Sequence, residues 1–77
     1  MSHNSVDKLV KMANQIGAFF VAQKVGAADG MADHLRKFWD PHMRAEIIEH
    51  VKHGGAGLDP IAIEAIKSLD DQAKGAA

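Results

Sequence analysis

The sequence of 77 residues contains no cysteine and no tyrosine, and it has only one tryptophan and two prolines. Without cysteine, the chain can form neither disulfides nor thiolate metal sites. Nine basic and ten acidic residues give a formal charge of −1, so no positive field favours nucleic acid or an anionic membrane as a partner. No apolar run approaches the roughly 20 residues that span a bilayer, and no signal-peptide pattern is present. We therefore expect a protein of the cytoplasm, or of another reducing compartment.

Hydrophobic residues return at steps of three and four along most of the chain, which is the spacing of amphipathic helices. This pattern predicts helices over residues 5–24, 28–39, 41–53 and 60–69. No segment alternates apolar and polar residues as a strand does. We expect a single all-α domain over residues 1–77, a small bundle of about four helices joined by short Gly and Asp-Pro turns. The domain should be ordered over about 5–69 and end in a frayed tail over 70–77.

The first predicted helix has the widest apolar surface. Its stripe covers roughly 200° of the helix circumference, where about 100° suffices for a helix that packs on one side. Phe19 and Val21 are among the residues that widen it. We therefore expect this helix to be covered from two sides and to be the most buried of the four. Gly17 on the same surface predicts that a neighbouring backbone approaches closely there.

The sequence Asp-Pro occurs at Asp40-Pro41 and again at Asp59-Pro60. Aspartate is a preferred N-cap, and proline suits the first helical position because its missing N–H would have no partner there. Both pairs therefore predict the start of a helix. The glycine cluster over residues 54–57 follows the third predicted helix. It lacks the spacing of a phosphate-binding loop, which indicates a helix cap and turn.

Histidine and glutamate residues gather near the end of the third predicted helix. His50 and His53, with Glu46 and Glu49, could present two nitrogens and a carboxylate to zinc. The same residues also form ordinary pairs four apart on a helix, Glu46 with His50 and Glu49 with His53. The pairs are the favoured interpretation, and we predict no metal site. A stand-alone metal- or ligand-binding helical module remains the alternative function.

The segment between the second and third predicted helices is the candidate for partner binding. It contributes Phe38, Trp39, His42 and Arg44, to which we add Ile63 on the polar face of the last helix. We call these five residues the docking corner. Arg44 falls in the apolar arc of its helix, so it must reach water, pair with a buried carboxylate or meet a partner. Because Trp and Arg are frequent at binding hot spots, we expect Phe38 in the core, Trp39 partly exposed, and Arg44 paired with a partner carboxylate.

Three segments resemble the delta subunit of soluble NAD-dependent molybdenum formate dehydrogenases. They are Lys11–Phe20 (KMANQIGAFF), His34–Arg44 (HLRKFWDPHMR) and Gly54–Pro60 (GGAGLDP), and they occur in the order of that family. The second segment is the most specific of the three. The chain departs from the usual family pattern at His42, where the family has arginine between proline and methionine.

The resemblance implies a small, cofactor-free accessory subunit without catalytic residues of its own. The molybdenum cofactor, iron–sulfur clusters, FMN and NAD would belong to the larger subunits, which would be its partners. Assembly, cofactor insertion and stabilisation of the complex are the roles left open. Homo-oligomer formation is a second option for the isolated chain.

Overall fold

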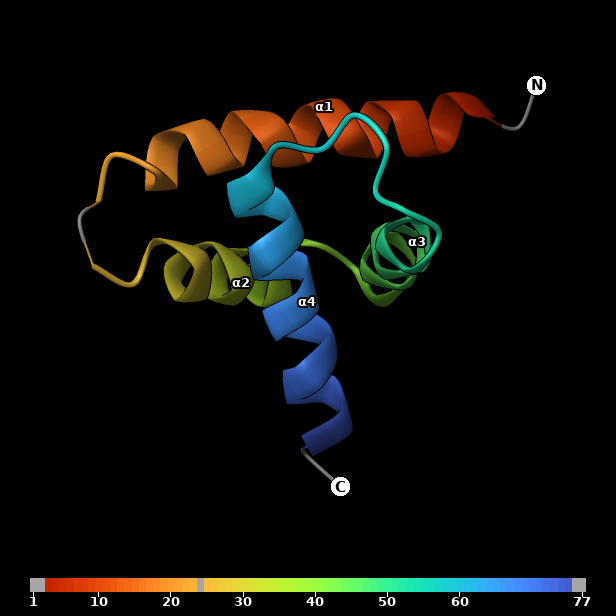
Figure 1. The fold of residues 1–77 in the computed structure, drawn as a ribbon. Helices are drawn as coiled ribbons and strands as arrows, with labels where there is room; N and C mark the ends of the chain where they lie inside the picture. The colour runs from red at the N-terminus through yellow and green to blue at the C-terminus, as the bar shows by residue number, and fades with distance from the viewer. Residues whose placement is uncertain (1–2, 24, 76–77) are drawn as a thin grey trace.

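The computed structural model describes residues 3–23 and 25–75, and its fold is all-α, as predicted. The helices are α1 (His3–Phe20), α2 (Ala27–Phe38), α3 (Pro41–Lys52) and α4 (Pro60–Gly75). No strand occurs in the described ranges. Figure 1 shows α1 along one side of the molecule and α2 running back beneath it. Helix α4 crosses the pair at a steep angle, and α3 stands at the end of α2.

Two helix ends differ from the prediction. Helix α1 ends at Phe20, where a turn closed by the Gln23 N–H and the Phe20 carbonyl at 2.9 Å replaces the expected last helical turn. Helix α4 continues to Gly75, so residues 70–75 of the predicted frayed tail are helical. That stretch contains Gln, Ala and Lys, which favour helix, and no proline to end it. The last part of the predicted tail, residues 76–77, lies outside the described residues.

The core lies between α2 and α4, which make the most extensive contact of any two helices described. Small side chains line this crossing: Ala32 on α2 and Ala62 and Ala65 on α4 are fully buried. Alanine lets two helices approach closely and leaves room for larger residues on either side. The large side chains without any exposed surface are Met31, Leu35, Ile47 and Ile66.

The expectation that the first helix is the most buried was wrong. Helix α1 lies across one side of the α2–α4 pair (Figure 1) and buries a single stripe, which contains Leu9 and Ala13. Two residues that widened its apolar surface remain outside, since Phe19 is 71% and Val21 59% exposed. Gly17 does leave room for a close neighbour, but that neighbour is a side chain and not the predicted backbone, because a Cβ at Gly17 would lie only 3.0 Å from Cγ2 of Ile61. The described chain therefore covers α1 from one side only.

The glycine cluster is a helix cap and turn, as predicted. After α3, the Gly55 N–H donates to the His50 carbonyl at 2.9 Å and the Gly54 N–H to the Val51 carbonyl at 3.0 Å. This is the Schellman pattern of a helix C-terminus, and both glycines have positive φ angles, of 64° and 112° respectively. The turn leads directly into α4.

The side chain of Asn14 fastens the α3–α4 turn to α1. Its amide nitrogen donates to the Gly57 carbonyl at 2.9 Å, and its amide oxygen accepts from the Asp59 N–H at 2.8 Å. Both halves of the amide are therefore used on backbone groups more than forty residues away. This contact sets where α4 begins relative to α1.

Candidate interaction surface

The chain turns between α2 and α3 as the sequence predicts. The Asp40 carboxylate accepts from the Met43 N–H at 2.8 Å, and Pro41 occupies the first turn of α3. Trp39 ends α2 in an extended conformation, while its N–H still donates to the Leu35 carbonyl at 2.9 Å. The two aromatic residues at this turn therefore point in different directions.

The exposures expected for these two aromatic residues were reversed. Trp39 is 5% exposed and belongs to the core, whereas Phe38 is 72% exposed. Phe38 is the last residue of the helix and Trp39 is its extended C-cap. The change in backbone conformation between them turns the Trp39 side chain inward, and a regular helical spacing does not reveal this change.

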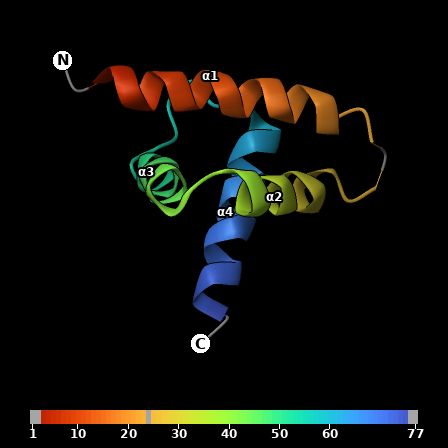
Figure 2. The same cartoon turned by 180° about the vertical axis from the view of Figure 1, so that it is seen from behind.

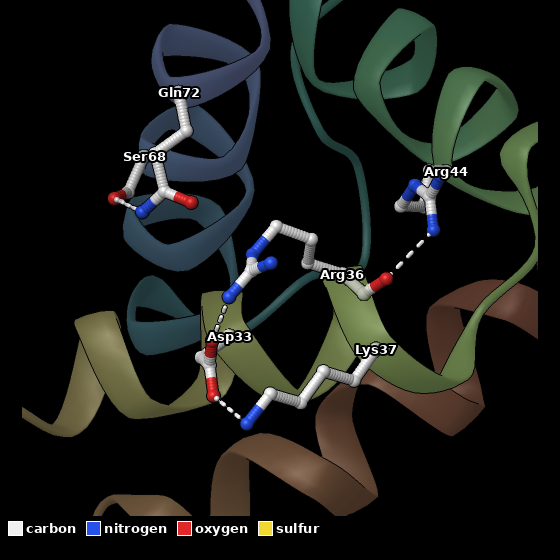
Figure 3. Close-up of polar contacts among 6 residues, drawn as sticks. All are labelled: Asp33, Arg36, Lys37, Arg44, Ser68 and Gln72. Carbon is white, nitrogen blue, oxygen red and sulfur yellow. Dashed lines mark hydrogen bonds and ion pairs between the residues drawn. The ribbon is translucent and has the colours of Figure 1, made fainter. Parts of the chain in front are cut away.

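The observed contacts of Arg44 lie within its own chain, and its pairing with a partner carboxylate stays a prediction. Its guanidinium donates to the Arg36 carbonyl at 2.8 Å and also to the Trp39 carbonyl; Figure 3 shows the first of these contacts. A helix leaves its last carbonyls without partners, and a cation there also opposes the negative end of the helix dipole. Arg44 thus caps α2 from α3, in a half-buried position.

The remaining residues of the docking corner are separated by the fold. Ile63 was expected on a polar surface, but it is half buried and packs against the core. A Cβ on Gly55 would lie 3.4 Å from the Ile63 side chain, so Ile63 covers the α3–α4 turn. His42 is exposed, with its Nε2 atom 3.5 Å from the Glu46 carboxylate. In the docking corner, Phe38 and His42 are therefore mostly exposed, Arg44 and Ile63 are half buried, and Trp39 is buried.

The histidine and glutamate residues of α3 line a hollow of about 530 Å³ beside Val6 of α1. His50 Nε2 lies 2.8 Å from the Ala56 carbonyl, and His53 Nδ1 lies 2.9 Å from the Glu49 carbonyl. The predicted pair of Glu49 with His53 is present, at 3.4 Å. Glu46 approaches His42 rather than the predicted His50. Within the described residues, no three His, Asp or Glu side chains converge as metal ligands.

Four rings form a continuous row across α1 and α2, which we call the aromatic row: Phe19, Phe20, His34 and Phe38. Their centroids follow one another at 5.3, 5.9 and 4.7 Å. The two ends of the row are mostly exposed, since Phe19 is 71% and Phe38 72% accessible. The sequence patterns did not predict this row. The unusually wide apolar surface of α1 was the sequence feature that indicated exposed apolar residues on this helix.

A groove of about 280 Å³ accompanies the aromatic row. All the residues that line it come from α1 and α2: Gln15, Ile16, Phe19, Phe20 and His34. Seen from behind in Figure 2, α1 and α2 lie side by side and α4 passes on the far side of α2. A face of the α1–α2 pair is thus left without cover from α4.

Charged residues on α2 are arranged around Asp33. Its carboxylate binds Lys37 Nζ at 3.0 Å and also binds the Arg36 guanidinium (Figure 3). Hydrogen bonds from Lys37 and then from Arg36 hold the pKa of the Asp33 carboxyl below its ordinary value of 3.8. All three side chains are more than two fifths exposed, so this is a solvated cluster beside the aromatic row.

The family model described as the NADH-dependent formate dehydrogenase delta subunit FdsD matches residues 8–66. The chain belongs to this family. The match contains all three segments that suggested the resemblance, so that recognition is confirmed. No curated protein and no solved structure matches the chain. None of the described helices of this delta subunit has the length and apolarity needed to cross a membrane.

The segments that resemble the delta subunit family also hold the fold together. Asn14 in the first segment binds Gly57 and Asp59 in the third. Arg44 and the carbonyls that it caps, those of Arg36 and Trp39, lie within the second segment. All four rings of the aromatic row come from the first two segments as well. In this delta subunit the same short stretches therefore supply both the packing and the exposed rings.

Proposed function

We propose that the chain is a non-catalytic accessory subunit of an NAD-dependent formate dehydrogenase and binds the larger subunits of that complex. Membership of the delta subunit family supports this role. The molybdenum cofactor, iron–sulfur clusters, FMN and NAD would lie in the larger subunits. A chain without cysteine has no thiolate with which to hold an iron–sulfur cluster, which agrees with that division.

The observation that carries a binding role is the exposed aromatic row. Monomeric proteins rarely leave large contiguous apolar surfaces open, and those that they do leave are often interaction sites. Here Phe19 and Phe38 are each more than 70% exposed in a chain of only 77 residues. The apolar surface of α1 is wide enough to be covered from two sides, and its own chain covers one of them. A larger subunit would cover the other.

Co-expression with the larger subunits tests this function. An affinity-tagged chain should co-purify with them in a fixed ratio, as identified by mass spectrometry of the separated subunits. The isolated chain should form no NADH from formate and NAD. An unrelated tagged helical domain of similar size serves as the control for adventitious binding. The proposal is wrong if the tagged chain co-purifies with neither the immature nor the mature larger subunits, or if it oxidises formate alone.

The same preparation distinguishes the three accessory roles. Larger subunits made without the chain should contain less molybdenum or iron if it acts in cofactor insertion. They should contain the same metals but dissociate more readily on gel filtration if it stabilises the complex. If it acts only in assembly, the mature active complex should form with the chain and then be recovered without it.

A further inference from the structure

The aromatic row is a receptor for one particular kind of structure. We propose that the row and its groove receive an amphipathic α-helix from a larger formate dehydrogenase subunit, whose apolar side chains enter between α1 and α2. This inference rests on the proposed function, since it assumes that those subunits are the partners. The inference adds to the proposed function the surface through which the chain binds and the kind of structural element that this surface receives.

The lining of the groove defines the side chains that would enter it. Ile16, Phe19 and Phe20 are hydrophobic, and among the described residues Gln15 and His34 supply the only polar groups of the lining. No carboxylate, ammonium or guanidinium of the described ranges 3–23 and 25–75 lines the groove. An inserted charge would therefore lose water without gaining a partner. Apolar side chains fit this lining.

The size of the groove favours side chains over a small molecule. Its volume of about 280 Å³ lies just below the range of about 300–1,000 Å³ that is typical of ligand pockets. Its dimensions suit a few inserted side chains of a larger element.

The spacing of the rings favours a helix as that element. Neighbouring centroids lie 5.3, 5.9 and 4.7 Å apart, and one turn of an α-helix rises about 5.4 Å. Because neighbouring rings are in contact, a helix laid along the row could place about one side chain per turn against each ring in succession. Helices that bind in grooves use apolar residues at i, i+3 or i+4, and i+7 in this way.

The exposed area argues against a second copy of the chain as the occupant. If a fully buried phenylalanine covers about 150–250 Å², Phe19 and Phe38 together leave roughly 200–350 Å² open. A stable protein–protein interface needs about 800 Å² from each partner. The aromatic row supplies less than half of that, whereas a single helix can cover a strip of this width.

Single substitutions at the ends of the row test the surface. Phe19→Ala and Phe38→Ala should each weaken binding of the chain to the purified larger subunits by more than about tenfold. Val25→Ala is the matched control, because Val25 is apolar and 88% exposed but takes part in none of the ring contacts. It should change binding less than about twofold. Circular dichroism of each variant should match that of the unchanged chain, which excludes unfolding as the cause.

Cross-linking identifies the occupant without altering the rings. Because the chain has no cysteine, Gln15→Cys places a single thiol in the groove for a benzophenone maleimide. The proposal requires cross-links to a helix of a larger subunit, at residues three or four apart. Cross-links only to a second copy of the chain, or unchanged binding by both phenylalanine variants, would overturn it while leaving the proposed function intact. Failure of the unchanged chain to bind at all would overturn both.

Discussion

Arg44 links the end of α2 to the first turn of α3. Its guanidinium donates to the Arg36 carbonyl at 2.8 Å and to the Trp39 carbonyl. These acceptors are among those that α2 cannot satisfy within itself. Both bonds come from the same terminal nitrogen, Nη1, which carries two N–H groups and can therefore donate to two carbonyls at once. An arginine in an apolar arc here serves as a structural cap within its own chain.

Replacing Arg44 should therefore destabilise the isolated chain. We expect Arg44→Ala to lower the free energy of unfolding by about 0.5–1.5 kcal/mol, because the part-buried Trp39 carbonyl loses its donor whereas the exposed Arg36 carbonyl can bind water instead. Arg44→Lys keeps the positive charge but replaces the guanidinium by an ammonium, so the free energy of unfolding of this variant should lie between those of the unchanged chain and of Arg44→Ala. Urea unfolding followed by circular dichroism measures both. An unchanged midpoint for Arg44→Ala would show that water satisfies the carbonyls equally well.

The Asp33 carboxylate gives α2 a weak dependence on pH. Because Lys37 and Arg36 lower its pKa below 3.8 in the folded chain, the ionised form is favoured by folding. The resulting stabilisation is present above that ordinary value and is lost as the pH falls through the lower pKa of the folded state. The effect should be small, because these side chains are exposed to solvent.

Comparison with Asp33→Asn isolates this contribution from the other carboxyl groups. The thermal midpoint of the unchanged chain should exceed that of the variant near about pH 6, and the two should converge towards about pH 2. Raising the salt concentration at the higher pH should also reduce the difference, because ions screen exposed charges. A difference that stays constant over the whole pH range would exclude the ion pairs as its source.

At the scale of the helices, the two Asp-Pro starts turn out to work differently. At α3 the Asp40 carboxylate accepts the Met43 N–H at 2.8 Å, which is a side-chain cap. At α4 it is the backbone of Asp59 that is held, because its N–H donates to the Asn14 amide oxygen. Within the described residues, no backbone N–H binds the Asp59 carboxylate. The same dipeptide, Asp-Pro, therefore fixes the start of α3 through the aspartate side chain and the start of α4 through the aspartate backbone.

This difference predicts unequal effects of substitution. Asp40→Ala should lower the free energy of unfolding by about 0.5–2 kcal/mol, because a first-turn N–H loses its acceptor. Asp59→Ala keeps the backbone N–H and should cost clearly less. Asn14→Ala should instead cost about 1–3 kcal/mol, since it removes both contacts to the turn before α4. Equal urea midpoints for the Asp40 and Asp59 variants would contradict the distinction.

Local patterns predicted the helices better than they predicted their contacts. The four helices, the Asp40 cap and the glycine turn follow from spacing and turn chemistry that act within a few residues. The double contact of Asn14 could not be predicted, because its partners are backbone groups 43 and 45 residues away in the sequence. The continuation of α4 past Leu69 was missed because its last turns have little apolar periodicity.

At the scale of the whole molecule, the width of the apolar surface of a helix did not predict how deeply that helix is buried. The wide surface of α1 suggested the centre of the domain, but the most extensive helix contact is that of α2 with α4, where Ala32, Ala62 and Ala65 are fully buried. Part of the α1 surface then remained outside as the end of the aromatic row. A sequence pattern cannot distinguish an apolar residue that is covered by its own chain from one that is covered by another chain.

Phe38 and Trp39 allow this distinction to be tested with neighbouring residues. A domain of this size has a core that supplies about 3–5 kcal/mol, and removing a buried aromatic side chain costs a similar amount. Trp39→Ala should therefore leave much of the isolated chain unfolded, because Trp39 is 5% exposed. Phe38→Ala should change the free energy of unfolding by no more than about 0.5 kcal/mol, since its side chain is 72% exposed.

Far-ultraviolet circular dichroism as a function of temperature measures both variants by the same signal, which does not depend on the single tryptophan. Two equally cooperative transitions at the same temperature would mean that Trp39 contributes little to the core. A large loss of stability for Phe38→Ala would mean that its ring is covered in solution, as it would be in a dimer. Retained stability for Phe38→Ala would mean that the unchanged chain does not need the Phe38 ring for its own fold. That ring is then available to stabilise a complex with a partner.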